Sequence, residues 1–277
     1  MLGRAIAIQL QNSGVAVVSV GRSPKDDIHF DLNAKDRKVW SDERADVLFH
    51  CAASFAGNGE ADFMRNFETN TSSAYDVISL AASLRAKMVI YAGTVFSNEL
   101  DVENFNSYGL TKGLAESVMN WAARMSGIAF CSLRLSQLYD TEGQCCRHQP
   151  WFGRIVAYAS RGLDIRMPRS LGPRNYLHIE DAAKAMISAA VSGHSGVFNS
   201  IHPQSMTLQE IAEVAYAIFA QGGRSISAGE KTPFRNIAFP SLTTNQLFGI
   251  KARTIQEGLL QIKNAGTSDA FGPMDVQ

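Results

Sequence analysis

Residues 87–93 read KMVIYAG, a short apolar run that begins after a lysine and closes on a glycine. Similar runs occur at 15–20 (VAVVSV), 46–53 (DVLFHCAA) and 130–136 (FCSLRLS). Their apolar residues are largely continuous rather than alternating, which is typical of strands that are buried on both faces of a parallel sheet. The four runs therefore predict four buried, parallel strands.

Helical patterns separate these strands. Apolar residues recur at helical spacing over 2–12, with Gly14 placed to end the helix, and again over about 60–86 and 107–126. Strand and helix alternate without hairpin signals, so the connections are predicted to be βαβ crossovers. The fold class is therefore α/β: a doubly wound parallel (Rossmann) sheet with a smaller C-terminal substrate-binding lobe.

We expect three parts along the chain. Residues 1–140 form a dinucleotide-binding Rossmann core, and 141–263 form mainly the substrate-binding lobe, with segments that return to the core. Within the lobe, Thr207 and Thr254 have the capping-box spacing that begins a helix. The tail at 264–277 is rich in Gly, Ser, Asp and Pro and is expected to be disordered.

Composition excludes several function classes. The 277 residues include 26 Lys+Arg and 26 Asp+Glu, and 45% are hydrophobic, as in a compact globular protein. A nucleic-acid or membrane-surface protein would need a basic excess, and no apolar run approaches the ~20 residues of a membrane span. The four cysteines lack CxxC spacing, so we expect no metal site and a reducing, cytoplasmic location.

Gly21-Arg22-Ser23 follows the first predicted strand. Ligands of doubly wound sheets bind outside the C-terminal ends of the strands. An acid at this point binds the adenosine ribose of NAD, whereas an arginine accommodates the 2′-phosphate of NADP. No acid stands at 20–23, so the sequence favours NADP over NAD; the alternative is a solvent-exposed Arg22 in a loop.

Tyr108 and Lys112 are four residues apart, on one face of the helix predicted at 107–126. A tyrosine that exchanges protons near neutrality needs its pKa of ~10 lowered, and a cation one turn away has this effect. A tyrosine and a lysine at this spacing are more often ordinary residues of a helix surface than catalytic residues. Its position on the first helix after the strand at 87–93 makes the two residues a candidate proton-transfer pair.

Five segments carry a resemblance to a known family, and they occur in the family's order. They are Asp46–Ala53 (DVVxHxAA in the family), Asn70–Ser73 (NxxGT), Leu133–Tyr139 (LRxxNVYG), Pro173–Asp181 (xRDYxHVxD) and Gly196–Asn199 (GxYNxG). The chain thereby resembles the extended short-chain dehydrogenase/reductase family, which comprises sugar-nucleotide epimerases, dehydratases and reductases. The resemblance extends from Gly3 to about Leu260 and does not specify the substrate.

The resemblance implies roles for individual residues. Tyr108 would be the catalytic acid/base, and Lys112 would lower its pKa and hold the nicotinamide ribose. Thr94 would hydrogen-bond the substrate oxygen at the carbon that exchanges hydride. Gln137 and Arg174 would bind the substrate, Arg174 through a nucleotide diphosphate. Besides Tyr108 and Lys112, the cofactor would contact Gly3, Arg22, Ser23, Asp31, Leu32, Cys51, Ala52, Ala53 and Asn70.

The chain departs from the family pattern in four ways. It starts at Met1-Leu2-Gly3, so the first strand and all but the last glycine of a GxxGxxG turn are missing; a late start or a true truncation would explain this. The stretch from Thr94 to Tyr108 is short, and a gap placed elsewhere would put Ala92 at the hydroxyl position. Gln137 replaces an asparagine. No acid directly follows Thr94, which argues for reduction or epimerisation over dehydration.

The leading hypothesis is an NADP-dependent (NAD possible) reductase or epimerase that acts on a nucleotide-linked sugar. The alternatives are a non-catalytic dinucleotide-binding or sensor protein, an inactive truncated product, or an enzyme that reduces a hydroxysteroid, a flavanone-like ketone or a simple aldehyde. Family members commonly dimerise through the helices equivalent to 60–86 and 107–126, so a homodimer is possible. We expect neither nucleic acid nor a membrane as a partner.

Overall fold

The structure is a computed structural model that describes residues 1–37, 41–98, 106–170, 172–232 and 243–276. The chain divides into two units, each of which is considered by itself. The sheet unit comprises Leu2–Leu135 and Ala183–Ser200, and the lobe unit comprises Met1, Ser136–Ala182 and Ile201–Gln277. The predicted boundary after residue 140 therefore falls inside the lobe unit, and 183–200 form the segment that returns to the sheet.

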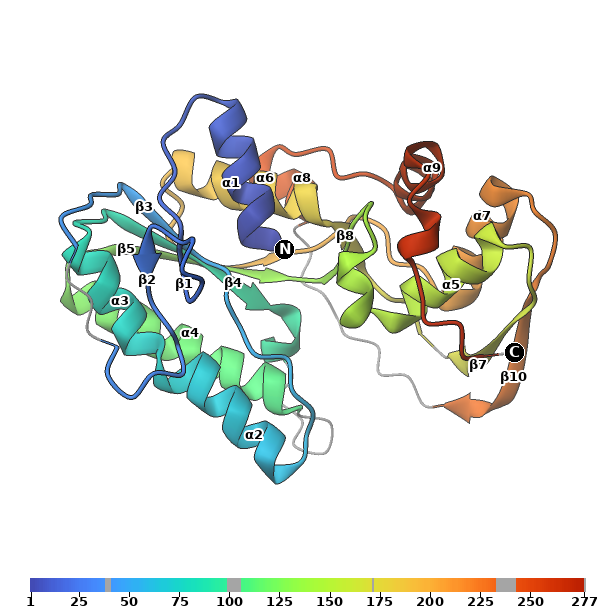
Figure 1. Ribbon diagram of the computed structural model, residues 1–277, viewed down its shortest axis with the longest axis horizontal. Coiled ribbons are helices and arrows are strands. Elements are labelled where there is room, and N and C mark those ends of the chain that lie inside the picture. Colours follow the sequence, from blue (N-terminus) through green and yellow to red (C-terminus); the bar gives the residue numbers. More distant parts are fainter. Residues whose placement is uncertain (38–40, 99–105, 171, 233–242, 277) are drawn as a thin grey trace. The chain divides into compact units, whose positions relative to one another are not determined.

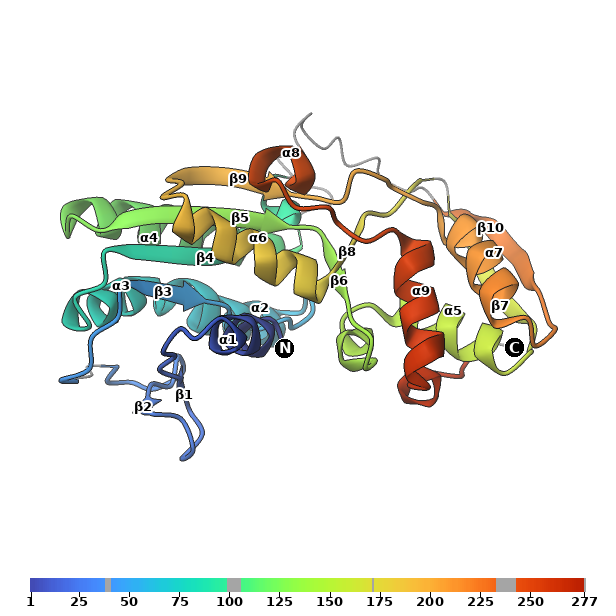
Figure 2. The ribbon, with the colours of Figure 1, turned by 90° about the horizontal axis from the view of Figure 1, so that it is seen from above.

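A four-stranded parallel sheet forms the centre of the sheet unit. Figure 2 shows its strands side by side in the order β3 (Val47–His50), β4 (Met88–Thr94), β5 (Ala129–Leu135) and β9 (Gly196–Ser200). All residues of β4 are buried, as expected for a strand with neighbours on both edges and helices on both faces. The predicted doubly wound α/β architecture is confirmed.

Helices cover both faces of this sheet. In Figure 1, α3 (Ala74–Ser83) and α4 (Ser107–Met125) lie on one side of it, and α1 (Leu2–Asn12) lies on the other. Apolar residues of α3 and α4 form one buried cluster with Val89 and Tyr91 of β4. Removal of this apolar surface from water, worth roughly 25 cal/mol per Å², fixes α4 against the strand that precedes it.

The helix predicted at about 60–86 consists of three segments. α2 (Glu60–Asn66) continues into the π-helix η1 (Phe67–Ser72), and α3 follows. Single π-helical turns inside α-helices are frequent at functional sites. Here the π-helix contains Asn70, one of the predicted site residues.

The strand predicted at 15–20 is wrong in extent and in burial. Only Val20 and Gly21 form a strand, β1, which pairs in parallel with β2 (Ile28–His29). Val15 is 48% exposed. A strand needs a hydrogen-bonded neighbour along its length, and among the described residues β1 has one only in β2.

The lobe unit is built from helices and two small parallel ladders. Its core contains apolar residues of α5 (Pro150–Ser160), α7 (Leu208–Phe219) and α9 (Ile255–Ala265). The capping boxes predicted at Thr207 and Thr254 begin α7 and α9 and are confirmed. Strand β6 (Gln137–Tyr139) pairs with β8 (Tyr176–His178), and β7 (Ile165–Ser170) pairs with β10 (Ser225–Thr232). The lobe unit also contains η4 (Gln144–Arg147), α8 (Thr244–Phe248) and η5 (Ser268–Ala270). The sheet unit contains η2 (Val95–Asn98) and most of α6 (Ile179–Val191).

The tail is packed over its described residues, in contrast to the predicted disorder. Phe271 is 4% exposed in the lobe core. Asp275 accepts two hydrogen bonds from Arg154, at 2.6 and 2.7 Å, and the backbone N–H of Val276 donates to the Tyr158 hydroxyl at 2.9 Å. One buried aromatic ring and one bidentate ion pair thus anchor a segment whose small and polar composition alone indicates disorder.

No helix within the described part of the chain combines the length and the apolar character that crossing a bilayer requires.

Candidate active site

The end of β4 and the start of α4 bring Thr94 and Tyr108 together. Thr94 is the last residue of β4, is 4% exposed, and its side chain lies near the Tyr108 phenol. Burial raises the pKa of this phenol, and the neighbouring Thr94 side chain lowers it. Of the two residues that the sequence left open for the hydroxyl position, Thr94 and Ala92, Thr94 is therefore the one that contacts the tyrosine.

Lys112 lies one helical turn after Tyr108 and is 2% exposed. Its Nζ is 4.0 Å from the centroid of the Tyr91 ring, and no described residue gives this ammonium a hydrogen-bond acceptor. Burial lowers the pKa of Lys112 to about 7, against the opposing effects of Cys51 and Glu116. A buried ammonium with unused donors is suited to bind the hydroxyls of a ribose.

Asn70 holds the segment that follows β3. Its Oδ1 accepts from the backbone N–H of Ser54 at 2.7 Å, and its Nδ2 donates to the Ser54 carbonyl at 3.1 Å and to Thr111 Oγ1 at 3.2 Å. Asn66, one turn earlier, makes the matching pair of bonds with Ala56. The amide of Asn70, predicted to contact the cofactor, is thus used to fix the loop after β3 against α4.

Gly3 and Cys51 lie together at the C-terminal end of β3. A β-carbon on Gly3 would stand 3.7 Å from Cys51 Cβ, an ordinary contact distance. Burial raises the pKa of the half-buried Cys51 thiol to about 12, so this thiol is neutral near pH 7. Ala52 is exposed and Ala53 is half-buried. The structure thus brings the start of α1 to the residues predicted to line the cofactor path.

Arg22 and Ser23 lie exposed in the turn after β1, where a carboxylate joins them. Asp26 Oδ2 accepts from the backbone N–H of Ser23 at 2.8 Å. A β-carbon on Gly21 would stand 2.9 Å from Asp26 Cγ, so this carboxylate occupies the space that a side chain at position 21 would fill. Residues 20–23 at the end of β1 contain no acid, but the loop that follows brings the Asp26 carboxylate to this strand end.

Asp31 and Leu32 follow β2. The Asp31 carboxylate accepts from the backbone N–H of Asn33 at 3.0 Å, and the buried Leu32 accepts at its carbonyl from Arg37 Nε at 2.8 Å. Thr69 of η1 donates to Asn33 Oδ1 at 2.7 Å. These bonds fix the segment predicted to contact the adenine against the helices of the sheet unit.

The two predicted substrate residues, Gln137 and Arg174, belong to the lobe unit. Gln137 donates from Nε2 to Gln149 Oε1 at 2.6 Å. The backbone of Arg174 pairs with Met206 in an antiparallel bridge, with bonds of 2.7 and 2.9 Å, and the residue is half-buried. The structure thus places each of them on a fixed backbone within that unit.

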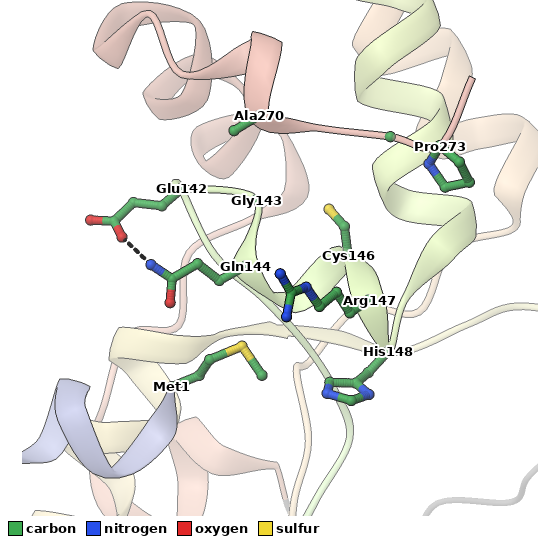
Figure 3. A pocket seen from close by; sticks show the side chains of 10 residues that line it. Met1, Glu142, Gly143, Gln144, Cys146, Arg147, His148, Ala270 and Pro273 are labelled. Carbon is green, nitrogen blue, oxygen red and sulfur yellow. Dashed lines mark hydrogen bonds between the residues drawn. The ribbon is translucent and has the colours of Figure 1, made fainter. Parts of the chain in front are cut away.

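A pocket of about 600 Å³ also lies in the lobe unit (Figure 3). In the figure, Gln144 donates a hydrogen bond to Glu142, at 2.7 Å. Burial and the charge of Arg147 lower the pKa of His148. None of the predicted site residues lines this pocket. Its lining consists of Met1, Glu142, Gly143, Gln144, Cys146, Arg147, His148, Ala270, Gly272 and Pro273.

Two charged residues near the predicted site do not emerge from the sequence reasoning. Glu116 follows Lys112 at the four-residue spacing that relates Lys112 to Tyr108, so extending the helix-face argument by one turn would find it. No sequence pattern indicates that Asp26 lies near the predicted site. Its carboxylate reaches the end of β1 through a turn in which the backbone N–H of Asp26 donates to the Ser23 carbonyl at 3.0 Å.

The sheet unit fits a nicotinamide dinucleotide at three points. Lys112 has unused donors beside Tyr108, Gly3 leaves room at the start of α1, and the turn at Arg22 and Ser23 presents a cation at a strand end. Arg22 and Ser23 follow β1, and Gly3 lies against Cys51, which follows β3; the C-terminal ends of parallel strands are where doubly wound sheets bind their ligands.

Comparison with solved structures identifies the same fold. RMD from Pseudomonas aeruginosa, complexed with NADPH, has a TM-score of 0.75 at 17% identity, over 97% of this chain and 96% of that one. UDP-N-acetylglucosamine 4-epimerase from Bacillus cereus has a TM-score of 0.71 at 16% identity, over 96% and 92%. MoeE5 in complex with UDP-glucose and NAD has a TM-score of 0.70 at 20% identity, over 96% of each chain.

Comparison with curated proteins returns no match. The model of the NAD dependent epimerase/dehydratase family, in contrast, matches residues 1–200. This match confirms the resemblance to the extended short-chain dehydrogenases/reductases that the motifs indicate. The chain therefore belongs to the NAD dependent epimerase/dehydratase family, whose members are NAD(P)-dependent enzymes.

Proposed function

We propose that the chain is an NAD(P)-dependent reductase or epimerase that acts on a nucleotide-linked sugar. The observation that supports this most directly is the arrangement of Thr94, Tyr108 and Lys112: a hydroxyl near a phenol, with a buried ammonium one helical turn away. These three groups together can transfer a proton at an alcohol or carbonyl oxygen, whereas a protein that only binds a dinucleotide has no need of the tyrosine beside the lysine.

Each residue has a distinct task in the proposed reaction. A bound nicotinamide dinucleotide supplies hydride transfer to or from a sugar carbon. Tyr108 moves the proton on the oxygen of that carbon, and Thr94 orients the oxygen by a hydrogen bond. Burial favours the neutral phenol of Tyr108, so the positive charge of Lys112 is needed to make the phenolate accessible.

A nucleotide-linked sugar is the proposed substrate class. The solved relatives with this fold include a UDP-N-acetylglucosamine 4-epimerase and a protein in complex with UDP-glucose. Arg174 is the proposed ligand of the diphosphate, because a guanidinium matches phosphate oxygens in geometry and charge, and Gln137 is a second proposed substrate contact. Residues 95–98, which follow Thr94, read VFSN and provide no acid there, which favours reduction or epimerisation over dehydration.

NADP remains the proposed cofactor preference, on the strength of Arg22. The relatives include one complex with NAD and one with NADPH, so the fold accommodates either. Arg22 is exposed at the end of β1, where it can meet a 2′-phosphate, and Asp26 lies in the same turn. We therefore propose that Arg22 attracts the 2′-phosphate of NADP and that the negative charge of Asp26 weakens the preference for NADP over NAD.

A homodimer through α4 is the proposed assembly. Leu110, Leu114, Trp121 and Met125 occur at helical spacing on one face of α4 and are 36%, 41%, 60% and 70% exposed. A contiguous apolar stripe of this kind marks an interaction surface. We further propose a reducing compartment, in keeping with the four free cysteines.

Tyr108→Phe tests the proposal. The variant should lose turnover on a panel of nucleotide sugars while its affinity for NADPH and NADH, measured by fluorescence titration, stays within about twofold. Tyr75→Phe, at a tyrosine that is 55% exposed on α3, is the matched control and should keep both properties. Cofactor binding without turnover by the unsubstituted chain would favour a sensor, and full activity of Tyr108→Phe would rule out this chemistry.

A further inference from the structure

A buried carboxylate lies one helical turn beyond Lys112. Glu116 is 5% exposed, and its side chain points to β5 rather than to solvent. Glu116 Oε2 accepts from Ser132 Oγ at 2.6 Å and from Arg134 Nε at 3.1 Å, while Oε1 accepts from Arg134 Nη2 at 2.5 Å. The carboxylate is thus fixed by a bidentate guanidinium and one hydroxyl.

The guanidinium of Arg134 is itself held. Its Nη1 donates to Asn98 Oδ1, and Asn98 Nδ2 donates to Asn199 Oδ1 of β9 at 3.0 Å. Asn98 is the last residue of η2, which begins directly after Thr94. One chain of side-chain bonds therefore runs from the helix of Tyr108 and Lys112 to the segment that follows Thr94.

The protonation states of the groups around Lys112 determine which charge acts on its ammonium. Burial lowers the pKa of His50 to about 3 and raises the pKa of Cys51 to about 12, so both are neutral near pH 7. Burial also raises the pKa of Tyr91 and Tyr108, and their phenols are neutral as well. Among the described groups that interact with the ammonium, Glu116 is thus the negative charge near neutral pH, and Arg134 behind it carries a positive one.

A buried ion pair is not an efficient way to stabilise a fold. The desolvation of both partners consumes most of their attraction, and apolar residues of the same volume often do as well. Between α4 and β5 a leucine–methionine contact would give comparable packing. What such a contact would lack is a fixed negative charge beside a buried lysine.

We propose that Glu116, fixed by Arg134 and Ser132, is a positioning residue of the Tyr108–Lys112 pair: it supplies a fixed negative charge one helical turn from the Lys112 ammonium. The link to catalysis rests on the proposed function, because it assumes that Lys112 acts on Tyr108 and on the cofactor ribose. The electrostatic link between Glu116 and Lys112 does not, so the two are separable by experiment.

The titration of Lys112 tests the electrostatic link without any substrate. The ¹³Cε resonance of Lys112, assigned by its loss in Lys112→Arg, is followed against pH in the whole protein. In Glu116→Gln the midpoint should fall by about one pH unit, because an attractive charge is removed. Glu116→Asp retains the charge and should return the midpoint toward that of the unsubstituted protein.

Ser132→Ala is the matched control. It removes one hydrogen bond from the same carboxylate but no charge, and its midpoint should equal that of the unsubstituted protein. A Glu116→Gln protein that is folded by circular dichroism and melts cooperatively, yet titrates Lys112 as before, would overturn the inference. If Glu116→Gln does not fold, Glu116→Asp and Glu116→Ala in the same titration decide it.

Cofactor affinity separates this inference from the proposed function. NADH affinity should fall as the pH rises through the Lys112 midpoint, and in Glu116→Gln this fall should begin about one unit lower. A midpoint that shifts without any change in the affinity profile supports the Glu116–Lys112 link and contradicts Lys112 as a cofactor ligand. An unshifted midpoint with pH-dependent affinity supports the ligand and overturns the link.

Discussion

Gly109 of α4 lies against the backbone of Phe96 in η2: a β-carbon on Gly109 would stand 2.7 Å from the Phe96 carbonyl oxygen. One turn later a β-carbon on Gly113 would meet Ser97 Cβ at 3.4 Å, and the Ser97 hydroxyl donates to the Gly109 carbonyl at 3.3 Å. The glycine at 109 thus permits α4 and η2 to approach closely, and this approach brings the end of β4, with Thr94, near the tyrosine that precedes Gly109.

Gly109→Ala should separate Thr94 from Tyr108. The added carbon meets a backbone oxygen that cannot rotate away, so we expect a loss of stability of about 1–3 kcal/mol and a fall in turnover of about tenfold or more. Urea unfolding and steady-state kinetics measure the two effects. Gly113→Ala is the control, since its carbon meets only a side chain and alanine favours the helix interior by about 1 kcal/mol. Equal stability and activity of Gly109→Ala would show that the close approach is not needed.

Asp26→Asn should strengthen the preference for NADPH. In the folded protein Asp26 accepts from the Ser23 N–H, so its carboxylate would compete with the 2′-phosphate that we propose for this turn. Removing this charge should raise NADPH affinity by about tenfold and change NADH affinity little. Fluorescence titration with both cofactors measures the ratio.

Asp27→Asn is the matched control for this experiment. The Asp27 carboxylate accepts from the backbone N–H and the hydroxyl of Ser19, both at 2.7 Å, and does not contact the turn at Ser23. Its replacement should leave the NADPH/NADH ratio unchanged. An equal change in both variants would assign the effect to overall charge rather than to the position of Asp26.

The sequence predicts best the parts whose pattern is repeated along the chain. The apolar run at 87–93 folds as expected because it pairs with β3 and β5, and the helix at 107–126 does so because one apolar face packs on β4 and α3. The run at 15–20 is also apolar, but only its last residue, Val20, lies in a strand, because among the described residues its one partner is β2. Strand formation depends on the neighbour, which composition does not reveal.

The candidate site is likewise predictable from the sequence only where a repeated pattern determines the position of a residue. The positions of Tyr108 and Lys112 follow from helix periodicity, and the resemblance to the family is what points to Thr94, whose side chain lies near Tyr108. The Asp26 carboxylate and the Asn98–Arg134 bond were not predictable, since each depends on loop or cross-strand geometry. The composition of the tail predicts disorder, but the tail is ordered because the burial of one residue, Phe271, stabilises it more than the polar residues around it destabilise it.

His50 should make the protein less stable in acid. It is 8% exposed at the end of β3, its ring stacks on Tyr91 at 5.6 Å, and burial with the charge of Lys112 lowers its pKa to about 3 from 6.5. Between pH 6.5 and pH 3 the His50 of the unfolded chain binds a proton that the His50 of the native state does not. The contribution of His50 to the free energy of unfolding is therefore fully present above pH 6.5 and is lost as the pH decreases toward 3.

His50→Phe keeps an aromatic ring on Tyr91 and removes this proton. Between neutral pH and about pH 4.5 the unsubstituted protein should lose about 2 kcal/mol more unfolding free energy than the variant. Urea unfolding at the two pH values measures the difference. His29→Phe, at an exposed residue of β2, should behave like the unsubstituted protein. The same acid dependence in His50→Phe would show that His50 is not the group responsible.

Trp121→Glu should convert the proposed dimer into monomers. Trp121 is 60% exposed in the centre of the apolar stripe on α4, and a carboxylate there would be buried without a partner if two stripes packed together. Light scattering after size-exclusion chromatography measures the mass, and NADH titration shows whether each monomer still binds cofactor. Val191→Glu is the control, since Val191 is 83% exposed at the end of α6 and away from the stripe on α4. If the mass of Trp121→Glu equals that of the unsubstituted dimer, α4 is not the interface; if the unsubstituted chain is already a monomer, the proposed dimer is ruled out.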